Sequence, residues 1–259
     1  MIADLTARVV VVTGAASGIG AAVARLAAAS GANLLLTDRD GEGCREVERK
    51  LAGAGARVAG LEADLMDAGA AQAIVGAASR AFGVIDGLVN AAGLTTRASV
   101  LHGTAEVWDE LFAINARAPF FLMQAAVADM LGRRAPGSVV NILSMNAHCG
   151  GPDLAIYAAT KGALLTLTRN AANAHLRDRV RVNGIALGWV ATEAEDRMQS
   201  ETLGLGPGWI AAAAARMPLG RLIAPEEAAR LAIYLLSEAS APMTGAIIDL
   251  EQRVLGAPG

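Results

Sequence analysis

The segment "IYAATKGAL" (156–164) carries the residues of this chain best suited to acid–base chemistry. Tyr157, one of only two tyrosines, stands four residues before Lys161. On a helix this spacing places both side chains on one face. A free tyrosine, with a pKa near ~10, is a poor base at neutral pH, and a nearby lysine ammonium would lower that pKa. The pair therefore predicts a tyrosine that takes up and returns a proton.

A glycine-rich turn, "TGAASGIG" (13–20), lies between an apolar run and a helical stretch. Gly14 permits a tight exit from a strand, while Gly18 and Gly20 let a pyrophosphate approach the helix amino terminus, whose N–H groups and dipole favour anions. The alternative is that these glycines only make a tight strand-to-helix connection. Asp38, at the end of the next strand, favours the cofactor, because an acid near this offset binds the ribose diol of NAD and repels the 2′-phosphate of NADP.

Two further residues bear on the cofactor. Arg39, beside Asp38, could accept a 2′-phosphate or stack on the adenine, so NAD is favoured and NADP remains possible. Asp64 ends the third predicted strand, where it could accept a hydrogen bond from the adenine amine or cap a turn.

The elements that must position these residues alternate between short β-branched runs and longer helical stretches, as in repeated βαβ units. This pattern predicts an α/β fold: a single domain over 1–259, built on a doubly wound, Rossmann-type, seven-stranded parallel sheet with helices on both faces. The one break, 188–217, is predicted to be a substrate-covering lid. The predicted strands are 8–13, 33–38, 56–63, 85–90, 137–144, 179–187 and 245–250, and the predicted helices are 19–30, 41–54, 68–82, 104–131, 155–176 and 225–238.

Composition excludes several classes of function. The 22 basic and 25 acidic residues are mixed along the chain and give a net charge of -3, so no nucleic-acid partner is expected. Cys44 and Cys149 lack the spacing of a disulfide scaffold or metal knuckle. His102, His148 and His175 are scattered and no HExxH motif occurs, so no metal site is expected. No signal segment or apolar run of about 18 residues is present, which predicts a cytoplasmic protein without a membrane partner.

Five segments resemble, in order and spacing, those of the short-chain dehydrogenase/reductase family, and the match covers nearly the whole chain. They are "TGAASGIG" (13–20), "NAAG" (90–93), Asn115, Ser144 and "YAATK" (157–161). The resemblance implies an oxidoreductase that interconverts a secondary alcohol and a ketone as its small-molecule substrate. It implies that Tyr157 is the acid/base, that Ser144 holds the substrate oxygen, and that Lys161 hydrogen-bonds the nicotinamide ribose.

Asn115 lies in "INARAPFF" (114–121), four residues before Pro119. Proline has no N–H to donate to the Asn115 carbonyl, and its ring pushes against that carbonyl, so a kink is predicted in the helix. By resemblance, the Asn115 backbone holds a water that links Lys161 to solvent.

The resemblance also implies a homo-oligomer, a tetramer or a dimer, in which the alanine-rich helices 104–131 and 155–176 could pack against copies of themselves. It extends the predicted cofactor-binding set to Gly14, Ser17, Gly18, Ile19, Gly20, Asp38, Arg39, Asp64, Leu65, Asn90, Ala91, Gly93, Tyr157, Lys161, Gly188, Val190 and Thr192.

Three segments are expected to face the nicotinamide: "LTTRAS" (94–99), "SMNAHCGGPD" (144–153) and "WVATEAEDRMQ" (189–199). They mix apolar with polar side chains, and a polar group buried against hydrocarbon costs ~1–3 kcal/mol. The mixture favours a small polar substrate, such as a sugar, a polyol or a hydroxy acid, unless half of these side chains face solvent. His148 could instead be an ordinary loop histidine. The apolar members are Met145, Trp189 and Met198, the polar ones are Arg97, Asn146, His148 and Glu193, and the substrate-binding candidates are Ser144, Asn146, His148 and Trp189.

Two departures from the family pattern leave the substrate open. Leu187 precedes Gly188 where many relatives carry Pro-Gly, and "DLEQRVLG" (249–256) stands where many end in Asp-Gly-Gly. Two alternative functions are an NADPH-dependent ketoacyl-type reductase, which usually has a basic residue inside the glycine turn, and a cofactor-sensing regulator without catalysis. The turn reads "AAS" (15–17) and both Tyr157 and Lys161 are present, which argues against each.

Overall fold

A computed structural model describes residues 3–255; residues 1–2 and 256–259, which the predicted domain includes, lie outside the described residues. The described chain forms one seven-stranded sheet in the order β3-β2-β1-β4-β5-β6-β7, and every neighbouring pair is parallel. This confirms the predicted Rossmann-type sheet. The strands are β1 (Val9–Thr13), β2 (Asn33–Asp38), β3 (Val58–Glu62), β4 (Gly87–Asn90), β5 (Gly137–Ser144), β6 (Val180–Leu187) and β7 (Ile247–Leu250).

The central strands are buried along their whole length because helices cover both faces of the sheet. Every residue of β1, β4, β5 and β6 is buried. A strand covered on both faces requires a nearly continuous apolar run rather than an alternating one, which explains the sequence "VVVVT" of β1. The edge strand β3 is only partly buried.

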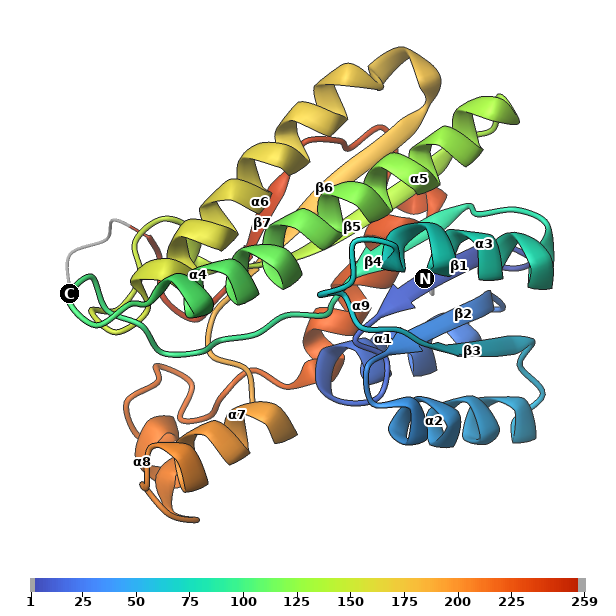
Figure 1. Ribbon diagram of the computed structural model, residues 1–259. Coiled ribbons are helices and arrows are strands. Elements are labelled where there is room, and N and C mark those ends of the chain that lie inside the picture. Colours follow the sequence, from blue (N-terminus) through green and yellow to red (C-terminus); the bar gives the residue numbers. More distant parts are fainter. Residues whose placement is uncertain (1–2, 256–259) are drawn as a thin grey trace.

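Two groups of helices build the two halves of the hydrophobic core (Figure 1). Helices α1, α2 and α9 pack on one face of the sheet, and α3, α5 and α6 pack on the other. The helices are α1 (Gly18–Ala29), α2 (Gly41–Gly53), α3 (Ala70–Phe82), α4 (Ala105–Phe112), α5 (Ala118–Gly132), α6 (Ala155–Ala174), α7 (Glu193–Arg197), α8 (Trp209–Ala214) and α9 (Pro225–Leu236).

The stretch Ala105–Gly132 is a continuous helical rod in which a π-helical turn, η1 (Ala113–Arg117), joins α4 to α5. By length and composition it could cross a membrane, but 61% of its most apolar window is buried inside this protein, as expected of a core helix. The turn η1 ends at Arg117, two residues before Pro119, the residue for which the sequence predicted a kink. The irregularity is therefore where it was expected, but the structure makes it a π turn, in which the Ala118 N–H donates to the Ala113 carbonyl.

The segment predicted as a lid contains α7, a π turn (Met198–Thr202) and α8. Figure 1 shows α7 and α8 in orange, set apart from the helices that cover the sheet. A small apolar cluster of its own holds the segment together, with Trp209 and Leu222 buried and Trp189 packed against them. The ring centroids of Trp189 and Trp209 are 5.8 Å apart.

Strand order reverses between β1 and β4, because β1, β2 and β3 progress in one direction and β4 to β7 in the other. In open α/β sheets, the carboxyl ends of the strands at such a reversal flank the crevice in which ligands bind. The fold thus predicts where to look for the site.

Candidate active site

A cavity of about 800 Å³ lies at the carboxyl ends of the strands. Residues that follow β1, β2, β3, β4, β5 and β6 all contribute to its wall, as do the lid residues Trp189, Thr192 and Glu195. The volume falls within the range of about 300–1,000 Å³ that holds small molecules and cofactors. One half is formed around the glycine-rich turn and the other around Tyr157.

The glycines of the turn serve different purposes. Gly14 and Gly18 have positive φ angles of 68° and 52°, which glycine adopts without strain. A Cβ on Gly14 would lie 2.8 Å from the Ala92 backbone, and a Cβ on Gly20 would lie 2.0 Å from the Gly14 carbonyl oxygen. Gly20 is thus required by the packing of the turn itself. Gly20 also lines the cavity, and its place in the cofactor site stays a prediction.

The amino terminus of α1 is suited to an anion. Its first turn contains no acidic residue, and the side chain of Ser17 makes no capping hydrogen bond. The Gly18 N–H donates to the carboxylate of Glu193, at the start of α7, at 3.1 Å. A negatively charged group from the lid thus binds the N–H where a pyrophosphate is expected, so the residues present fit a dinucleotide cofactor.

Asp38 also fits the cofactor half of the cavity, which it lines. One carboxylate oxygen accepts the Ala16 N–H and the other accepts the Asp40 N–H, both at 3.0 Å. These two bonds fix the carboxylate relative to the glycine turn, and each oxygen retains a lone pair for a ribose hydroxyl. Arg39 is exposed beside it. Asp64 lines the cavity and also accepts the Met66 N–H at 2.8 Å, so its turn-capping role is present as well.

All predicted cofactor-binding residues except Asn90 line the cavity. The Asn90 side chain is buried, and its amide donates to the Asn141 side chain at 2.7 Å, so it joins two neighbouring strands instead. The backbone after β4 is held by Thr13, whose hydroxyl accepts the N–H groups of Ala91 and Ala92, each at 3.1 Å.

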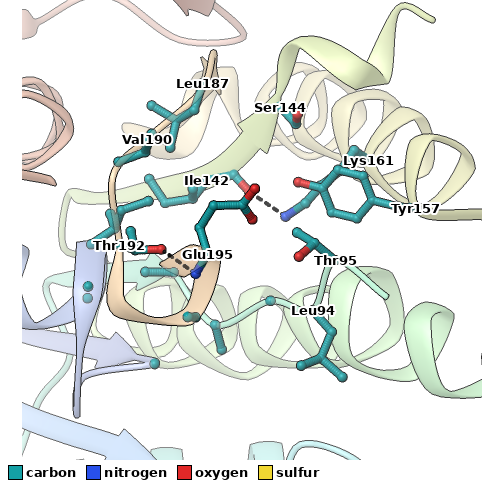
Figure 2. A pocket seen from close by; sticks show the side chains of 18 of the residues that line it. Leu94, Thr95, Ile142, Ser144, Tyr157, Lys161, Leu187, Val190, Thr192 and Glu195 are labelled. Carbon is teal, nitrogen blue, oxygen red and sulfur yellow. Dashed lines mark hydrogen bonds between the residues drawn. The ribbon is translucent and has the colours of Figure 1, made fainter. Parts of the chain in front are cut away.

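Helix α6 carries Tyr157 and Lys161 one turn apart, and both side chains face the cavity (Figure 2). Tyr157 is 8% exposed and Lys161 is 4% exposed. The Lys161 ammonium donates to the Ile142 carbonyl at 2.9 Å and lies 5.8 Å from the centroid of the Tyr157 ring. The predicted pair therefore shares one face of a helix, as its spacing required.

Burial dominates the electrostatics of this pair. It raises the pKa of Tyr157 to about 12, a rise that the Ser144 hydroxyl opposes by hydrogen bonding and the Glu195 carboxylate increases. Burial also lowers the pKa of Lys161 to about 8. The sequence predicted a lowered pKa for Tyr157, so its direction is corrected here: removal from water disfavours the phenolate more than the neighbouring groups stabilise it.

Ser144 ends β5 and stands beside Tyr157 in the cavity wall. Its oxygen accepts two hydrogen bonds from Asn146, from the backbone N–H at 3.1 Å and from the side-chain amide at 3.2 Å. Because the lone pairs of the oxygen are engaged, the hydroxyl proton is directed elsewhere. Ser144 can thus donate a hydrogen bond to an oxygen held near Tyr157.

Asn115 lies behind the cavity and is completely buried. Its side-chain amide is paired with Leu94, accepting the N–H and donating to the carbonyl at 2.9 Å each, and it donates to Thr160 at 3.1 Å. A Cβ on Gly93 would lie 3.3 Å from the Asn115 oxygen and 3.5 Å from the Lys161 ammonium. The side chain therefore ties α6 to the loop after β4.

Glu195 is a residue of the substrate half that the sequence did not single out. Its carboxylate accepts hydrogen bonds from Arg97, Trp189 and Gln199, and all four residues line the cavity. The pattern "TEAE" (192–195) has the spacing of a helix capping box, and the Thr192 hydroxyl does accept the Glu195 N–H. Only the position of Glu195 one turn before Gln199, on a segment already predicted to cover the substrate, could have indicated the cluster.

Of the four substrate-binding candidates, Ser144, Asn146 and Trp189 line the cavity and His148 does not. One ring nitrogen of His148 lies 4.0 Å from the Asp249 carboxylate. We therefore do not retain His148 as a candidate.

Comparison with known proteins extends over nearly the whole chain. A family model described as enoyl-(acyl carrier protein) reductase matches residues 14–252. The 2-(S)-hydroxypropyl-CoM dehydrogenase 3 of Xanthobacter autotrophicus is 36% identical over 246 residues, 94% of each chain. The gluconate 5-dehydrogenase of Gluconobacter oxydans is 33% identical, over 93% of this chain and 91% of that protein. The crystal structure of L-sorbose reductase from Gluconobacter frateurii, complexed with NADPH and L-sorbose, has a TM-score of 0.93 at 27% identity and covers 100% of both chains.

Proposed function

The chain belongs to the short-chain dehydrogenase/reductase family and is an NAD(P)-dependent oxidoreductase of the alcohol/ketone type, for which we propose Tyr157 as the acid/base and a small polar molecule as the substrate. The observation that carries the proposal is the convergence of Ser144, Tyr157 and Lys161 in one cavity, which the glycine-rich turn also lines.

In the oxidation of an alcohol, Tyr157 accepts the hydroxyl proton, and in the reduction of a ketone it donates one. Ser144 donates a hydrogen bond to the same substrate oxygen and stabilises the charge that develops there. When bound, the nicotinamide supplies the acceptor or donor of the hydride and, in its oxidised form, a positive charge near Tyr157. A tyrosine whose pKa is about 12 is fully protonated at neutral pH, and it is therefore ready to act as the acid in ketone reduction.

Lys161 is proposed to bind the nicotinamide ribose and to assist proton transfer. Its ammonium is held in the cavity wall by the Ile142 carbonyl, and its lowered pKa, about 8, allows it to exchange a proton near neutral pH. Asn115 acts through position, because its side chain fixes the loop after β4 against α6.

We propose that NAD is preferred and that NADP can also be used. Asp38 is held at the end of β2 by two backbone N–H groups, and a fixed carboxylate there favours a ribose diol over a 2′-phosphate. NADPH is the cofactor named for the L-sorbose reductase structure, and the exposed Arg39 offers a phosphate partner.

The proposed substrate is a sugar, a polyol or a hydroxy acid. Gluconate and L-sorbose are named for two of the similar proteins, and the substrate half of this cavity contains Arg97, Asn146 and Glu195. A hydrocarbon substrate would displace water from these side chains without replacing its hydrogen bonds, whereas substrate hydroxyl groups can replace them.

Three wider features are also proposed. The segment 188–217 covers the substrate as a lid within one domain, a role supported by Trp189, Thr192 and Glu195, which line the cavity. The chain forms a homotetramer, supported by the exposed apolar side chains of Trp108, Phe120 and Phe121 on α4 and α5. The protein acts in the cytoplasm, in agreement with its free cysteines.

A screen for dehydrogenase activity tests the proposed function. The purified protein is incubated with NAD or NADP and a panel of polyols, sugars, hydroxy acids, steroids and aromatic alcohols, and formation of reduced cofactor is followed by absorbance. We expect turnover on the polar members, with a higher kcat/KM for NAD than for NADP. Absence of turnover with every alcohol and both cofactors would contradict the proposed function, and higher kcat/KM on steroids would contradict the proposed substrate class.

A further inference from the structure

The Glu195 carboxylate reaches into the substrate half of the cavity, towards Tyr157 and Lys161 (Figure 2). Its side chain is 13% exposed. One oxygen, Oε1, accepts from Arg97 at 3.4 Å, from Trp189 at 2.9 Å and from Gln199 at 2.7 Å. Since these donors all bind Oε1, the second oxygen, Oε2, is positioned to accept a hydrogen bond from a substrate hydroxyl.

The Arg97 guanidinium is already paired with carboxylates of the protein. It is 18% exposed and lies 3.4 Å from Glu195 and 3.6 Å from Asp153. The Asp153 side chain is 59% exposed, so water and salt screen its charge, and Glu195 is the less exposed negative charge beside Arg97. The buried Lys161 ammonium faces the same cavity but donates to the Ile142 carbonyl. Arg197 and Arg253 also line the cavity, but both are exposed, so water and salt screen their charges.

We propose that Glu195 and Arg97 are a specificity-determining pair that selects a neutral polyol or ketose over a hydroxy acid of the same carbon skeleton. The inference rests on the proposed function, because it concerns the substrate of that same site. A hydroxyl near the reacting carbon can donate to Oε2 of Glu195. A carboxylate in that place would face a like charge with the one nearby guanidinium already paired, which disfavours its binding.

The same geometry couples Glu195 to the proton chemistry. Burial is the main cause of the high pKa of Tyr157, the Glu195 carboxylate raises it further, and the Ser144 hydroxyl and Arg97 guanidinium lower it. Around Tyr157 these groups come from α7, β5 and the segment after β4, while Lys161 lies on α6 itself. Replacing Glu195 by glutamine removes the charge that disfavours the phenolate, so alcohol oxidation should begin at lower pH.

The test compares galactitol with galactonate as a matched polyol and hydroxy acid. For the wild-type protein we expect kcat/KM for galactitol to exceed that for galactonate by about 10-fold or more. In Glu195→Gln we expect this ratio to fall by about 10-fold, and the acidic limb of the pH profile for galactitol oxidation to move to lower pH. Glu201→Gln is the matched control, because Glu201 is an exposed lid carboxylate outside the cavity wall, and it should change neither.

The outcomes separate this inference from the proposed function. Three results would overturn the inference and leave the assignment as an oxidoreductase intact. They are a wild-type kcat/KM for galactonate equal to or above that for galactitol, an unchanged ratio of these two values in folded Glu195→Gln, and turnover confined to apolar alcohols. Turnover with no alcohol and neither cofactor would instead overturn the proposed function and the inference with it. If thermal melting shows that Glu195→Gln does not fold, the galactitol to galactonate ratio of kcat/KM in the wild type tests the inference by itself.

Discussion

Lys161 is a cationic residue buried in the wall of the cavity. The residue is 4% exposed, and among the described residues its ammonium has one hydrogen-bond acceptor, the Ile142 carbonyl. Burial of a charge with so little compensation is unfavourable, and a residue retained at such a position points to a role in chemistry rather than stability.

Lys161→Met is expected to stabilise the protein in a pH-dependent way. Because burial lowers the pKa of Lys161 from 10.5 to about 8, the unfolded chain binds this proton more tightly than the folded chain does. Wild-type stability therefore rises between about pH 8 and 10.5, and the whole free-energy cost of burying the charge is present below about pH 8. At 1.36 kcal/mol per unit, we expect the variant to gain about 1–3 kcal/mol at pH 7 and almost nothing at pH 10.5, measured by urea unfolding. The exposed Lys50 provides the control, Lys50→Met. A gain that does not change with pH, or a loss at pH 7, would contradict the burial penalty.

Asp38→Ala is expected to shift cofactor selectivity. The variant loses the acceptor for the ribose diol and the charge that repels a 2′-phosphate, so kcat/KM with NAD should fall about 10-fold or more while NADP is used relatively better. Asp67→Ala serves as the control, since Asp67 likewise accepts a backbone N–H but lies outside the cavity wall; its NAD/NADP ratio should equal that of the wild type. A wild type that already prefers NADP in kcat/KM would show that the assignment of Asp38 is wrong.

Among the elements, the π turn η1 is the one whose irregularity serves the site. It ends two residues before Pro119, which has no N–H for the Asn115 carbonyl. It also contains Asn115, whose side chain binds Leu94 and Thr160. A regular α-helix would rotate Asn115 relative to these partners, since a π turn carries one extra residue.

Pro119→Ala is expected to separate stability from activity. Alanine restores the missing N–H and removes the ring, so the rod can become regularly helical and stability should hold or rise. Turnover should fall about 10-fold, because the restored N–H would take the Asn115 carbonyl, which by the family resemblance holds the water that links Lys161 to solvent. Pro225→Ala is the control, because Pro225 opens α9 at a position where a helix needs no N–H. Unchanged turnover in folded Pro119→Ala would show that the π turn is dispensable.

For the molecule as a whole, the sheet was predictable from sequence and much of the substrate half was not. Strands β2 and β5 have the predicted bounds, 33–38 and 137–144, because a strand buried on both faces has a mostly apolar interior. The role of Glu195 depends on the folding of the lid over Arg97, a contact between residues 98 positions apart. The pKa of Tyr157 depends on burial, which periodicity does not quantify.

The carboxyl-terminal departure from the family pattern is a further case that only the folded molecule explains. Gln252 binds Arg221 and Leu219 through its side chain, and Arg253 donates to the Arg216 carbonyl. A Cβ on Gly188 would lie 2.3 Å from the Glu251 carboxylate, so Glu251 covers the turn after β6. The segment that replaces the family's glycines therefore fastens the base of the lid.

Substitution of Tyr157 by phenylalanine tests the central claim most directly. Tyr157→Phe keeps the ring that packs in the wall of the cavity and removes the hydroxyl that exchanges the proton. We predict that kcat falls about 100-fold or more, as for loss of a general acid/base, while the Kd for NAD, measured by calorimetric titration, stays within a few-fold of wild type. The other tyrosine, Tyr234, is 38% exposed on α9, so Tyr234→Phe should retain full kcat. A Tyr157→Phe protein that binds NAD and turns over within a few-fold of wild type would contradict the assignment of Tyr157 as the acid/base.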